Sequence, residues 1–254
     1  MAYHENVDEV RDLFDRTART YDVLNHLFSF NVDNGWRKKL IRRSLAGSGA
    51  RVLDLCTGTG DVAISFAKSV DGAKVVGLDF SREMLERGRR KIEHEGLDAR
   101  VRFEEGDALN LSYPPGSFDV VCNSFGLRTL TNRPAAIAEM ARVARTGGRV
   151  LALEFLPPPR TLFGALYSFH LHTLMPLLGG TLSGYRQSYT YLSETVDSFP
   201  SAEEIAAMMR SAGLSDVGYD RLTGGIAYLF YGTKSRAGEA PFPRRSGEPR
   251  KEHA

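Results

Sequence analysis

The residues best suited to chemistry begin with a glycine-rich turn, Asp54-Leu55-Cys56-Thr57-Gly58-Thr59-Gly60. The turn follows the short apolar run 52–55 and precedes a segment with helical spacing of apolar residues, which predicts a strand-to-helix connection. Glycines such as Gly58 and Gly60 let the backbone turn tightly and approach a ligand closely. The turn alone does not identify that ligand, because many strand-to-helix connections use glycine.

Two more acidic residues follow apolar runs at later points in the chain. Asp79 ends the run 74–79, where a carboxylate can accept hydrogen bonds from both hydroxyls of a ribose. Asp107, followed by Ala108, comes after the run 101–103 and is placed to meet an adenine. The structural alternative is that Asp107 is simply a turn residue.

The order of these residues favours a methyl donor over a dinucleotide. Asp54 precedes the glycines, where it would repel a pyrophosphate but not the cationic sulfonium and amino groups of S-adenosylmethionine. Asp107 adds an adenine contact. The ordered set therefore predicts an S-adenosylmethionine-dependent methyltransferase. The set comprises Asp54, Gly58, Gly60, Asp79 and Asp107.

The elements that must position these residues alternate between strand and helix. Apolar runs at 52–55, 74–79, 101–103, 118–122 and 149–155 predict strands. Ser81 is a predicted helix N-cap, Pro134 suits a first helical turn, and Gly147-Gly148 is expected to end that later helix. This order predicts an α/β fold, Rossmann-like and doubly wound, with a mainly parallel sheet. Residues 214–222 and 226–233 predict an antiparallel edge hairpin.

The predicted organisation has three parts. Residues 1–50 are expected to be helical, and residues 51–234 form the main domain with an irregular insertion at 157–200. Residues 235–254, rich in Pro, Gly, Arg and Glu, are predicted to be disordered.

Composition excludes several classes of function. The net charge of +2 argues against a nucleic-acid partner, which needs clustered cations. The two cysteines fit neither a metal site nor a disulfide framework, so a reducing cytoplasm is expected. The polar start of the chain is unlike a secretory signal, and the sequence predicts no membrane span.

Further motifs resemble the demethylmenaquinone and polyprenyl-benzoquinol C-methyltransferase family over about residues 10–234. The matching motifs are Tyr21-Asp22-Val23-Leu24-Asn25 with Ser29-Phe30 and Trp36-Arg37, then Ser124-Phe125-Gly126-Leu127-Arg128, then Arg142-Val143, Gly147-Gly148 and Leu153-Glu154-Phe155. The chain departs from the family pattern at Arg145-Thr146, Thr129 and Asp33. The last two bear on the substrate side.

The resemblance implies contacts to the methyl donor and a lid over the substrate. The implied donor contacts are Thr59, Asp79, Asp107, Ala108 and Ser124. The lid would consist of the N-terminal helices and the segment after the fifth strand. The implied substrate is a prenylated quinol: demethylmenaquinol is preferred, and a polyprenyl-methoxy-benzoquinol or another small molecule is the alternative. A non-catalytic binding module is disfavoured by the intact Thr59, Asp79 and Arg128.

Arg128 and Tyr21 are the predicted catalytic residues. Carbon methylation needs an electron-rich ring, which a quinol becomes when a hydroxyl loses its proton. The guanidinium of Arg128 is suited to stabilising that oxyanion, and a structural ion pair is its alternative. Tyr21 is expected in the same pocket or on a packed helix face. The general base stays open among His170, His172 and Asp33.

The segment 162–178 carries a broad apolar surface. It predicts either a core helix or an entry for a prenyl tail with peripheral contact to the inner membrane surface. A homodimer is the expected assembly.

Overall fold

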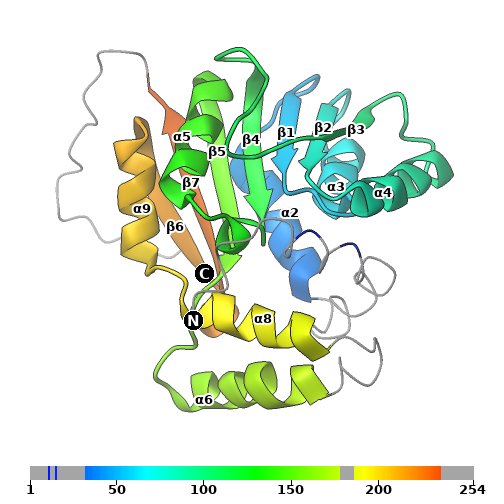
Figure 1. The fold of residues 1–254 in the computed structure, drawn as a ribbon. Coiled ribbons are helices and arrows are strands. Elements are labelled where there is room, and N and C mark those ends of the chain that lie inside the picture. The colour runs from blue at the N-terminus through cyan, green and yellow to red at the C-terminus, as the bar shows by residue number, and fades with distance from the viewer. Residues whose placement is uncertain (1–10, 12–14, 16–31, 178–185, 236–254) are drawn as a thin grey trace, which may run out of the picture.

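The computed structural model of the chain describes residues 11, 15, 32–177 and 186–235. A seven-stranded sheet forms its centre, in the order β3-β2-β1-β4-β5-β7-β6. Helices cover both faces (Figure 1). The strands are β1 Arg51–Leu55, β2 Lys74–Asp79, β3 Val101–Glu105, β4 Phe118–Ser124, β5 Ala144–Phe155, β6 Leu214–Leu222 and β7 Ala227–Lys234.

Strands β1 to β5 are parallel, and β7 is antiparallel to both β5 and β6. The predicted doubly wound sheet with a C-terminal edge hairpin is therefore confirmed, with β6 as the edge strand. Strand order reverses between β1 and β4, and ligands of such sheets bind beside that point, outside the carboxyl ends of the strands.

Apolar side chains pack on both faces of the sheet, as expected for strands buried on both sides. One core layer lies under α2 Val32–Ser44, α3 Asp61–Ser69 and α4 Arg82–His94, and includes the fully buried Leu40, Phe66 and Leu85. The other lies under α5 Arg133–Val143 and α9 Ala202–Ser211, and includes Ile137 and Ile205. These layers hold the strand ends, and thus the site, in place.

Helix ends follow local chemistry, with one correction. Ser81 caps α4 by accepting a hydrogen bond from the Met84 amide, as predicted. The prediction that Gly147-Gly148 ends α5 is wrong, because α5 ends at Val143 and β5 begins at once. The glycines instead serve an irregularity in β5. Gly147 has a φ of 74°, and a Cβ on Gly148 would lie 2.8 Å from the carbonyl oxygen of Arg145.

The insertion folds into helices beyond the carboxyl ends of β4 and β5 (Figure 1). It comprises α6 Leu162–Phe169, a π-helical turn His170–Leu174 and α8 Arg186–Asp197. A third, small core of Leu171, Met175 and Val196 joins these helices to each other. Of the predicted N-terminal helices, the part described is α2, whereas the C-terminal tail after residue 235 lies outside the described residues.

Candidate active site

The backbone of the glycine turn has positive φ angles at two positions. Gly58 and Gly60 have φ values of 56° and 85°, which favour glycine. A Cβ on Gly60 would lie 2.3 Å from the Phe103 ring, so the position also excludes larger residues by contact. The turn is tied to β2 by the Thr57 amide, which donates to the Leu78 carbonyl oxygen at 3.1 Å.

Asp54, at the start of the turn, points into the protein. Its carboxylate accepts a hydrogen bond from the Thr57 hydroxyl at 2.6 Å and is almost completely buried. Burial raises its pKa to about 7, although the bond from Thr57 opposes that shift. These contacts show Asp54 bracing the turn, and its predicted contact with the methyl donor stays a prediction.

Asp79 joins the end of β2 to the glycine turn. Its two carboxylate oxygens accept hydrogen bonds from the amides of Gly58 at 2.8 Å and Ser81 at 2.9 Å. Burial raises its pKa to about 6 in spite of these bonds. The carboxyl group is thus held at the strand end by backbone donors.

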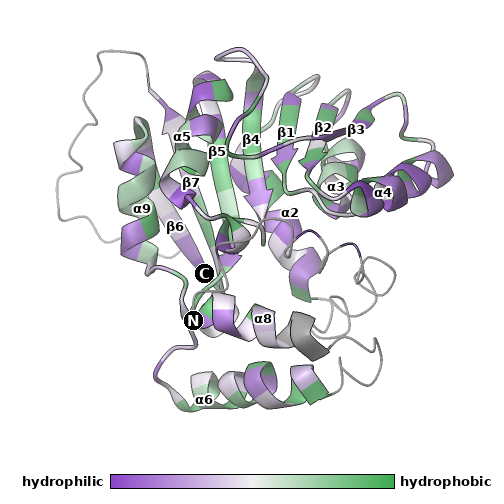
Figure 2. Cartoon of the chain, in the orientation of Figure 1, coloured by the Kyte–Doolittle hydropathy of each residue, from purple (hydrophilic) through white to green (hydrophobic). Residues whose placement is uncertain are grey.

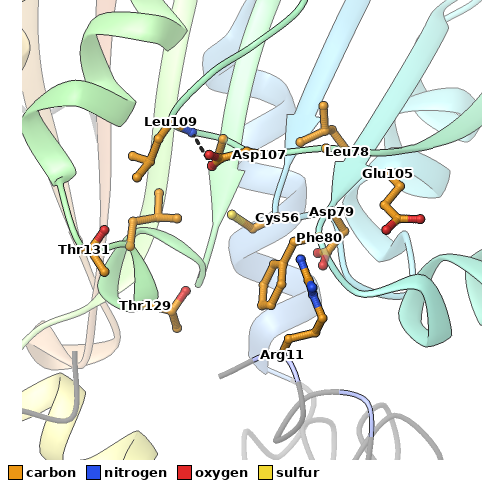
Figure 3. Close-up of a pocket in the computed structure, with 13 residues that line it drawn as sticks. Arg11, Cys56, Leu78, Asp79, Phe80, Glu105, Asp107, Leu109, Thr129 and Thr131 are labelled. Atoms are coloured by element: carbon orange, nitrogen blue, oxygen red, sulfur yellow. Dashed lines mark hydrogen bonds between the residues drawn. The ribbon is translucent and has the colours of Figure 1, made fainter. Parts of the chain in front are cut away.

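A cavity of about 490 Å³ opens beside Asp79. In Figure 3, Asp79 and Phe80 lie on the β2 side of it, Thr129 and Thr131 lie across from them, and Asp107 lies between the two groups. Asp107 accepts a hydrogen bond from the Leu109 amide at 2.8 Å. The lining residues are Arg11, Cys56, Leu78, Asp79, Phe80, Glu105, Gly106, Asp107, Ala108, Leu109, Thr129, Leu130 and Thr131. Its size suits a nucleoside-sized ligand.

Two residues of the N-terminal region reach this site. The guanidinium of Arg11 lies 5.8 Å from the centre of the Phe80 ring, within the range of a cation–π contact. Asp15 accepts a hydrogen bond from the Ser81 hydroxyl. The N-terminal region therefore contacts the cofactor side of the sheet.

Thr59 faces a charged cluster rather than the cavity. Its hydroxyl accepts a hydrogen bond from Lys91 at 2.9 Å, and Lys91 also pairs with Asp61 at 2.7 Å. Asp61 pairs in turn with Arg37 at 3.2 Å, which pairs with Asp33 at 2.8 Å. Asp33, one of the bases considered from the sequence, is thus a buried ion-pair partner.

Ser124 and Arg128 sit at the carboxyl end of β4. The Ser124 hydroxyl is buried and has no hydrogen-bond partner within the described part of the chain. Arg128 pairs with the buried carboxylate of Glu154 at 3.2 Å, and its backbone amide donates to the same carboxylate at 3.1 Å. Burial raises the pKa of Glu154, and the Arg128 charge opposes that shift.

The same guanidinium keeps one donor unused. Its Nη1 also donates to the Phe125 carbonyl oxygen, but Nε of Arg128 is buried with no acceptor among the described residues. A buried unpaired donor costs free energy unless a ligand pairs with it. Arg128 is therefore an ion-pair partner with a spare Nε donor, a feature that it shares among the described residues with Arg37, Arg87, Arg133 and Arg149.

Three aromatic rings pack together near the carboxyl ends of β4 and β5. Phe125 and Phe155 stack with centres 4.5 Å apart, and Trp36 lies against both at 6.1 and 5.9 Å. Trp36 is fixed by its indole N–H, which donates to the Thr223 hydroxyl at 2.9 Å. Helix α2, β4 and β5 thus supply one apolar wall.

The remaining candidates divide between the insertion and the undescribed N-terminus. His172 pairs with Asp197 at 2.8 Å, which links the π-helical turn to α8. Tyr21 lies outside the described residues. Among the residues that are described, no group of three or more His, Cys, Asp or Glu side chains could hold a metal ion.

Sequence reasoning missed Phe80, Arg11 and Glu154. Phe80 could have been found, because it directly follows Asp79, the acid at the end of β2 that is predicted to accept the ribose hydroxyls, and an aromatic ring there is placed to meet an adenine. Glu154 also carried a signal, since a carboxylate inside the apolar run 149–155 needs a buried partner. The contact of Arg11 with Phe80 has no local sequence signal.

The fold and the site define a class of protein. A putative S-adenosylmethionine-dependent methyltransferase from Methanococcus maripaludis matches with a TM-score of 0.63 at 17% identity, covering 93% of this chain and 98% of that one. A methyltransferase in complex with the Trm112 activator of Haloferax volcanii matches with a TM-score of 0.62 at 19% identity, covering 88% and 98%. The chain has the class I fold of S-adenosylmethionine-dependent methyltransferases.

Sequence comparison identifies the family within that class. Residues 2–234 match the ubiE/COQ5 methyltransferase family. A demethylmenaquinone methyltransferase from Thermus thermophilus is 44% identical over 87% of this chain and 100% of its own length. A ubiquinone/menaquinone biosynthesis C-methyltransferase from Bdellovibrio bacteriovorus is 42% identical over 90% of this chain and 97% of its own length. The chain belongs to the ubiE/COQ5 methyltransferase family and uses S-adenosylmethionine as its cofactor.

Proposed function

We propose that this enzyme methylates a ring carbon of demethylmenaquinol to give menaquinol, the last step of menaquinone synthesis. The observation that carries the proposal is the place of Arg128. Glu154 holds it at the carboxyl end of β4, directly before the segment Thr129–Thr131 that lines the cofactor cavity. The name of the Thermus relative supports the naphthoquinol ring as the substrate.

The cavity fits the proposed cofactor. When bound, S-adenosylmethionine supplies an electrophilic methyl group on its sulfonium. Asp79 would accept the ribose hydroxyls, and Phe80 with Ala108 offers the apolar surface that an adenine needs. Asp107 lies at the same rim. Gly58, Thr59 and Gly60 shape the turn nearest the methionine part, which Asp54 braces.

Ser124 adds a second argument for a ligand at this place. Its hydroxyl is buried and unpaired within the described residues, so a bound molecule would relieve an unfavourable state. The family resemblance places a donor contact at the same residue. We therefore assign Ser124 to the junction of the cofactor and the substrate.

Arg128 would act on the substrate. The ring carbon becomes nucleophilic as the neighbouring hydroxyl loses its proton, and negative charge then develops on that oxygen. The spare Nε–H of Arg128 can donate to this oxyanion while Nη1 stays bound to Glu154. The wall of Trp36, Phe125 and Phe155 would exclude water and hold the flat ring. Tyr21 keeps its predicted place in the same pocket.

The second candidate is methylation of a polyprenyl-methoxy-benzoquinol, as in ubiquinone synthesis. The printed name of the Bdellovibrio relative includes both pathways, and that favours keeping it. Another small-molecule substrate is the third candidate.

A methyl-transfer assay tests the proposal. Purified enzyme is incubated with S-adenosylmethionine and chemically reduced demethylmenaquinone, and the product is read by mass spectrometry. A product with one ring hydrogen replaced by a methyl group is expected. Absence of that product, with cofactor binding intact and a related enzyme active in parallel, would rule out the menaquinone substrate and leave the benzoquinol as the next test.

We also propose how the enzyme is organised and where in the cell it works. The N-terminal region and the insertion 157–200 form the lid, and the enzyme works in the cytoplasm in peripheral contact with the inner membrane surface. Within the described ranges, no helix combines the length and hydropathy that a bilayer crossing requires. Assembly as a homodimer stays a prediction, which light scattering tests.

A further inference from the structure

Helix α6 is apolar on two opposite sides, which is unusual for a helix on the surface of a protein. Its inner side continues into the π-helical turn and the residue after it, where Leu171 and Met175 are buried against Val196 of α8. Its outer side carries Leu162, Leu166 and Phe169. These positions are spaced by four and three residues, so they share one helix face.

That outer face is open to solvent. Leu162 is 90% exposed, Leu166 is 67% exposed and Phe169 is 53% exposed. Most of the exposed large apolar side chains of the described residues lie in this part of the chain, which also contributes Phe163 and Leu177. Figure 2 shows α6 at the outer edge of the molecule, with apolar residues along its length. We call Leu162, Leu166 and Phe169 the α6 face.

The segment that carries the α6 face holds no acidic side chain, and the nearby Asp197 of α8 is paired with His172. Although the chain carries 31 acidic residues, none lies between Phe155 and Ser193. Arg160 lies exposed just before α6. Arg221 is also exposed and lies close to α6. It donates to the carbonyl oxygen of Gly224, and the Phe163 ring of α6 packs against the same glycine. Basic groups thus border an apolar stripe.

The position of α6 links this face to the substrate side. The helix lies beyond the carboxyl ends of β4 and β5 (Figure 1). Its Tyr167, on the inner side, is half-buried, which raises the pKa of its hydroxyl, and the charges of Arg128, Asp197 and Glu154 all act on that pKa. One short helix therefore presents lipid-like surface outward and contacts the Arg128 region inward.

We propose that the α6 face is a docking surface for a lipid bilayer with anionic headgroups. It rests on the proposed function in one respect, because a prenylated quinol resides in the bilayer and must reach Arg128 from there. Leu162, Leu166 and Phe169 insert among the acyl chains, while Arg160 and Arg221 meet the headgroup phosphates. The docked enzyme turns its substrate side to the membrane.

A second copy of the chain fits this face less well. A stable interface buries about 800 Å² on each partner, more than one face of the eight-residue α6 supplies. A two-fold contact through α6 would also bring the arginines of both copies together.

Vesicle sedimentation with the full chain tests the proposal. Vesicles of phosphatidylcholine, with and without phosphatidylglycerol, are mixed with wild type, Leu162→Glu, Leu166→Glu and the double variant. Each exposed leucine that loses contact with the acyl chains should lower partitioning about tenfold. The matched control is Leu45→Glu, because Leu45 is 75% exposed but lies after α2, away from the face. Arg160→Ala should lower partitioning about fivefold on anionic vesicles only.

Two substrates separate this proposal from the proposed function. The double variant should keep the wild-type rate on a short-tailed, water-soluble demethylmenaquinol and lose rate on a long-tailed quinol embedded in vesicles. Unchanged vesicle binding in the double variant would overturn the docking surface and leave the function standing. A dimer in light scattering that Leu162→Glu dissociates would likewise overturn it in favour of a second copy. If the wild type had no activity on the soluble quinol, the proposed function would be wrong. The vesicle-binding data would still decide whether the α6 face binds the bilayer.

Discussion

The two sides of the active site are built in different ways. On the cofactor side, Asp79 and the glycine turn are held by hydrogen bonds from backbone amides at the ends of neighbouring strands. On the substrate side, the guanidinium of Arg128 is held by the buried carboxylate of Glu154 and by the carbonyl oxygen of Phe125, and the helices of the insertion share a small core of their own. Backbone amides alone donate to the carboxylate of Asp79, whereas a buried ion pair with Glu154 is the main contact of Arg128.

The difference has a functional consequence. A cofactor common to a whole class of enzymes needs the same geometry each time, and strand ends supply it with little freedom. A hydrophobic substrate must enter and leave the active site, which needs elements of lower local stability. A π-helical turn in the insertion is typical of such functional segments. Substitutions on the cofactor side should therefore mainly lower cofactor affinity, whereas substitutions on the substrate side should mainly lower kcat or loosen the insertion.

The largest effect is expected from Arg128. Arg128→Ala should lower kcat by about 10²–10³-fold, the usual cost of removing an oxyanion donor, while cofactor affinity stays near wild type. It should also destabilise the fold by about 3–5 kcal/mol, because Glu154 is left buried and unpaired. Steady-state kinetics and thermal unfolding measure the two losses.

A double variant separates catalysis from folding at this pair. Arg128→Met with Glu154→Gln removes both charges, so most of the lost stability should return. Activity should stay low if Arg128 stabilises the oxyanion. Recovery of activity together with stability would make the pair structural and refute the catalytic assignment.

Asp79 should give the next largest effect, and on binding instead of turnover. Asp79→Asn replaces a carboxylate that would accept the ribose hydroxyls, and hydrogen bonds to charged groups contribute about 1.5–3 kcal/mol. The dissociation constant for S-adenosylmethionine should rise about 30–100-fold in calorimetry, with kcat at saturating cofactor changed much less. Asp107→Asn, at the exposed rim, is the matched comparison and should cost about tenfold or less. An equal rise in the dissociation constant for both variants would mean that Asp79 contributes no more to cofactor binding than Asp107 does.

The pH dependence of cofactor binding should follow from the same carboxyl group. Burial raises the pKa of Asp79 to about 6, and the ionised form is the better acceptor for two hydroxyls. Affinity should therefore be constant above about pH 7 and fall as the pH drops through 6. Calorimetry across this range measures it, and Asp79→Asn should flatten the curve. A wild-type affinity that does not change between pH 5 and 8, a range bracketing the shifted pKa, would contradict the assignment.

The stability of the cofactor-free protein should have the opposite pH dependence. Because of Asp54, its free energy of unfolding should fall as the pH rises. Its pKa of about 7 in the folded chain lies above the value of about 4 for an unfolded aspartate. The stabilisation from this group is fully present below pH 4 and is lost as the pH rises through 7. Asp54→Asn should abolish that part of the pH dependence in thermal unfolding.

The placement of Asp79, Asp107 and Ala108 on the cofactor side was predictable from sequence, whereas the turn of Thr59 toward Lys91 was not. Asp54, Gly58 and Gly60 precede a helix, and Asp79 ends a strand, so alternation of apolar runs places them at one edge of a parallel sheet. The structure brings Asp79, Asp107 and Ala108 to one cavity. Local order along the chain was enough because the positions depend on strand ends.

The substrate side was less predictable because its contacts join distant residues. Arg128 was singled out, but its partner Glu154 was not, since a buried ion pair between the turn after β4 and the neighbouring β5 has no spacing rule. The end of α5 at Val143 was also missed, because the glycines that suggested a later end serve the irregularity in β5. The π-helical turn likewise depends on packing against α8.

The smallest effect is expected at the pair that joins the π-helical turn to α8, His172 and Asp197. Partial burial lowers the pKa of His172, but its hydrogen bonds to Asp197 and Ser168 outweigh burial and raise the pKa overall. Stabilisation from the charged pair is therefore full below about pH 6.5, the ordinary histidine value, and is lost as the pH rises through the raised pKa. An exposed pair of this kind contributes about 0.2–1 kcal/mol.

His172→Gln should accordingly lower the melting temperature by about 1–3 °C at pH 6 and by less at pH 9. The matched control is His94→Gln, since His94 is exposed on α4 away from the lid. Amide hydrogen exchange should speed up in α8 and the π-helical turn but not in the strands around Asp79, because the lid opens without the sheet. Faster exchange across the whole chain would show that both sides unfold as one unit, and the contrast between a fixed cofactor side and a separately opening lid would then be wrong.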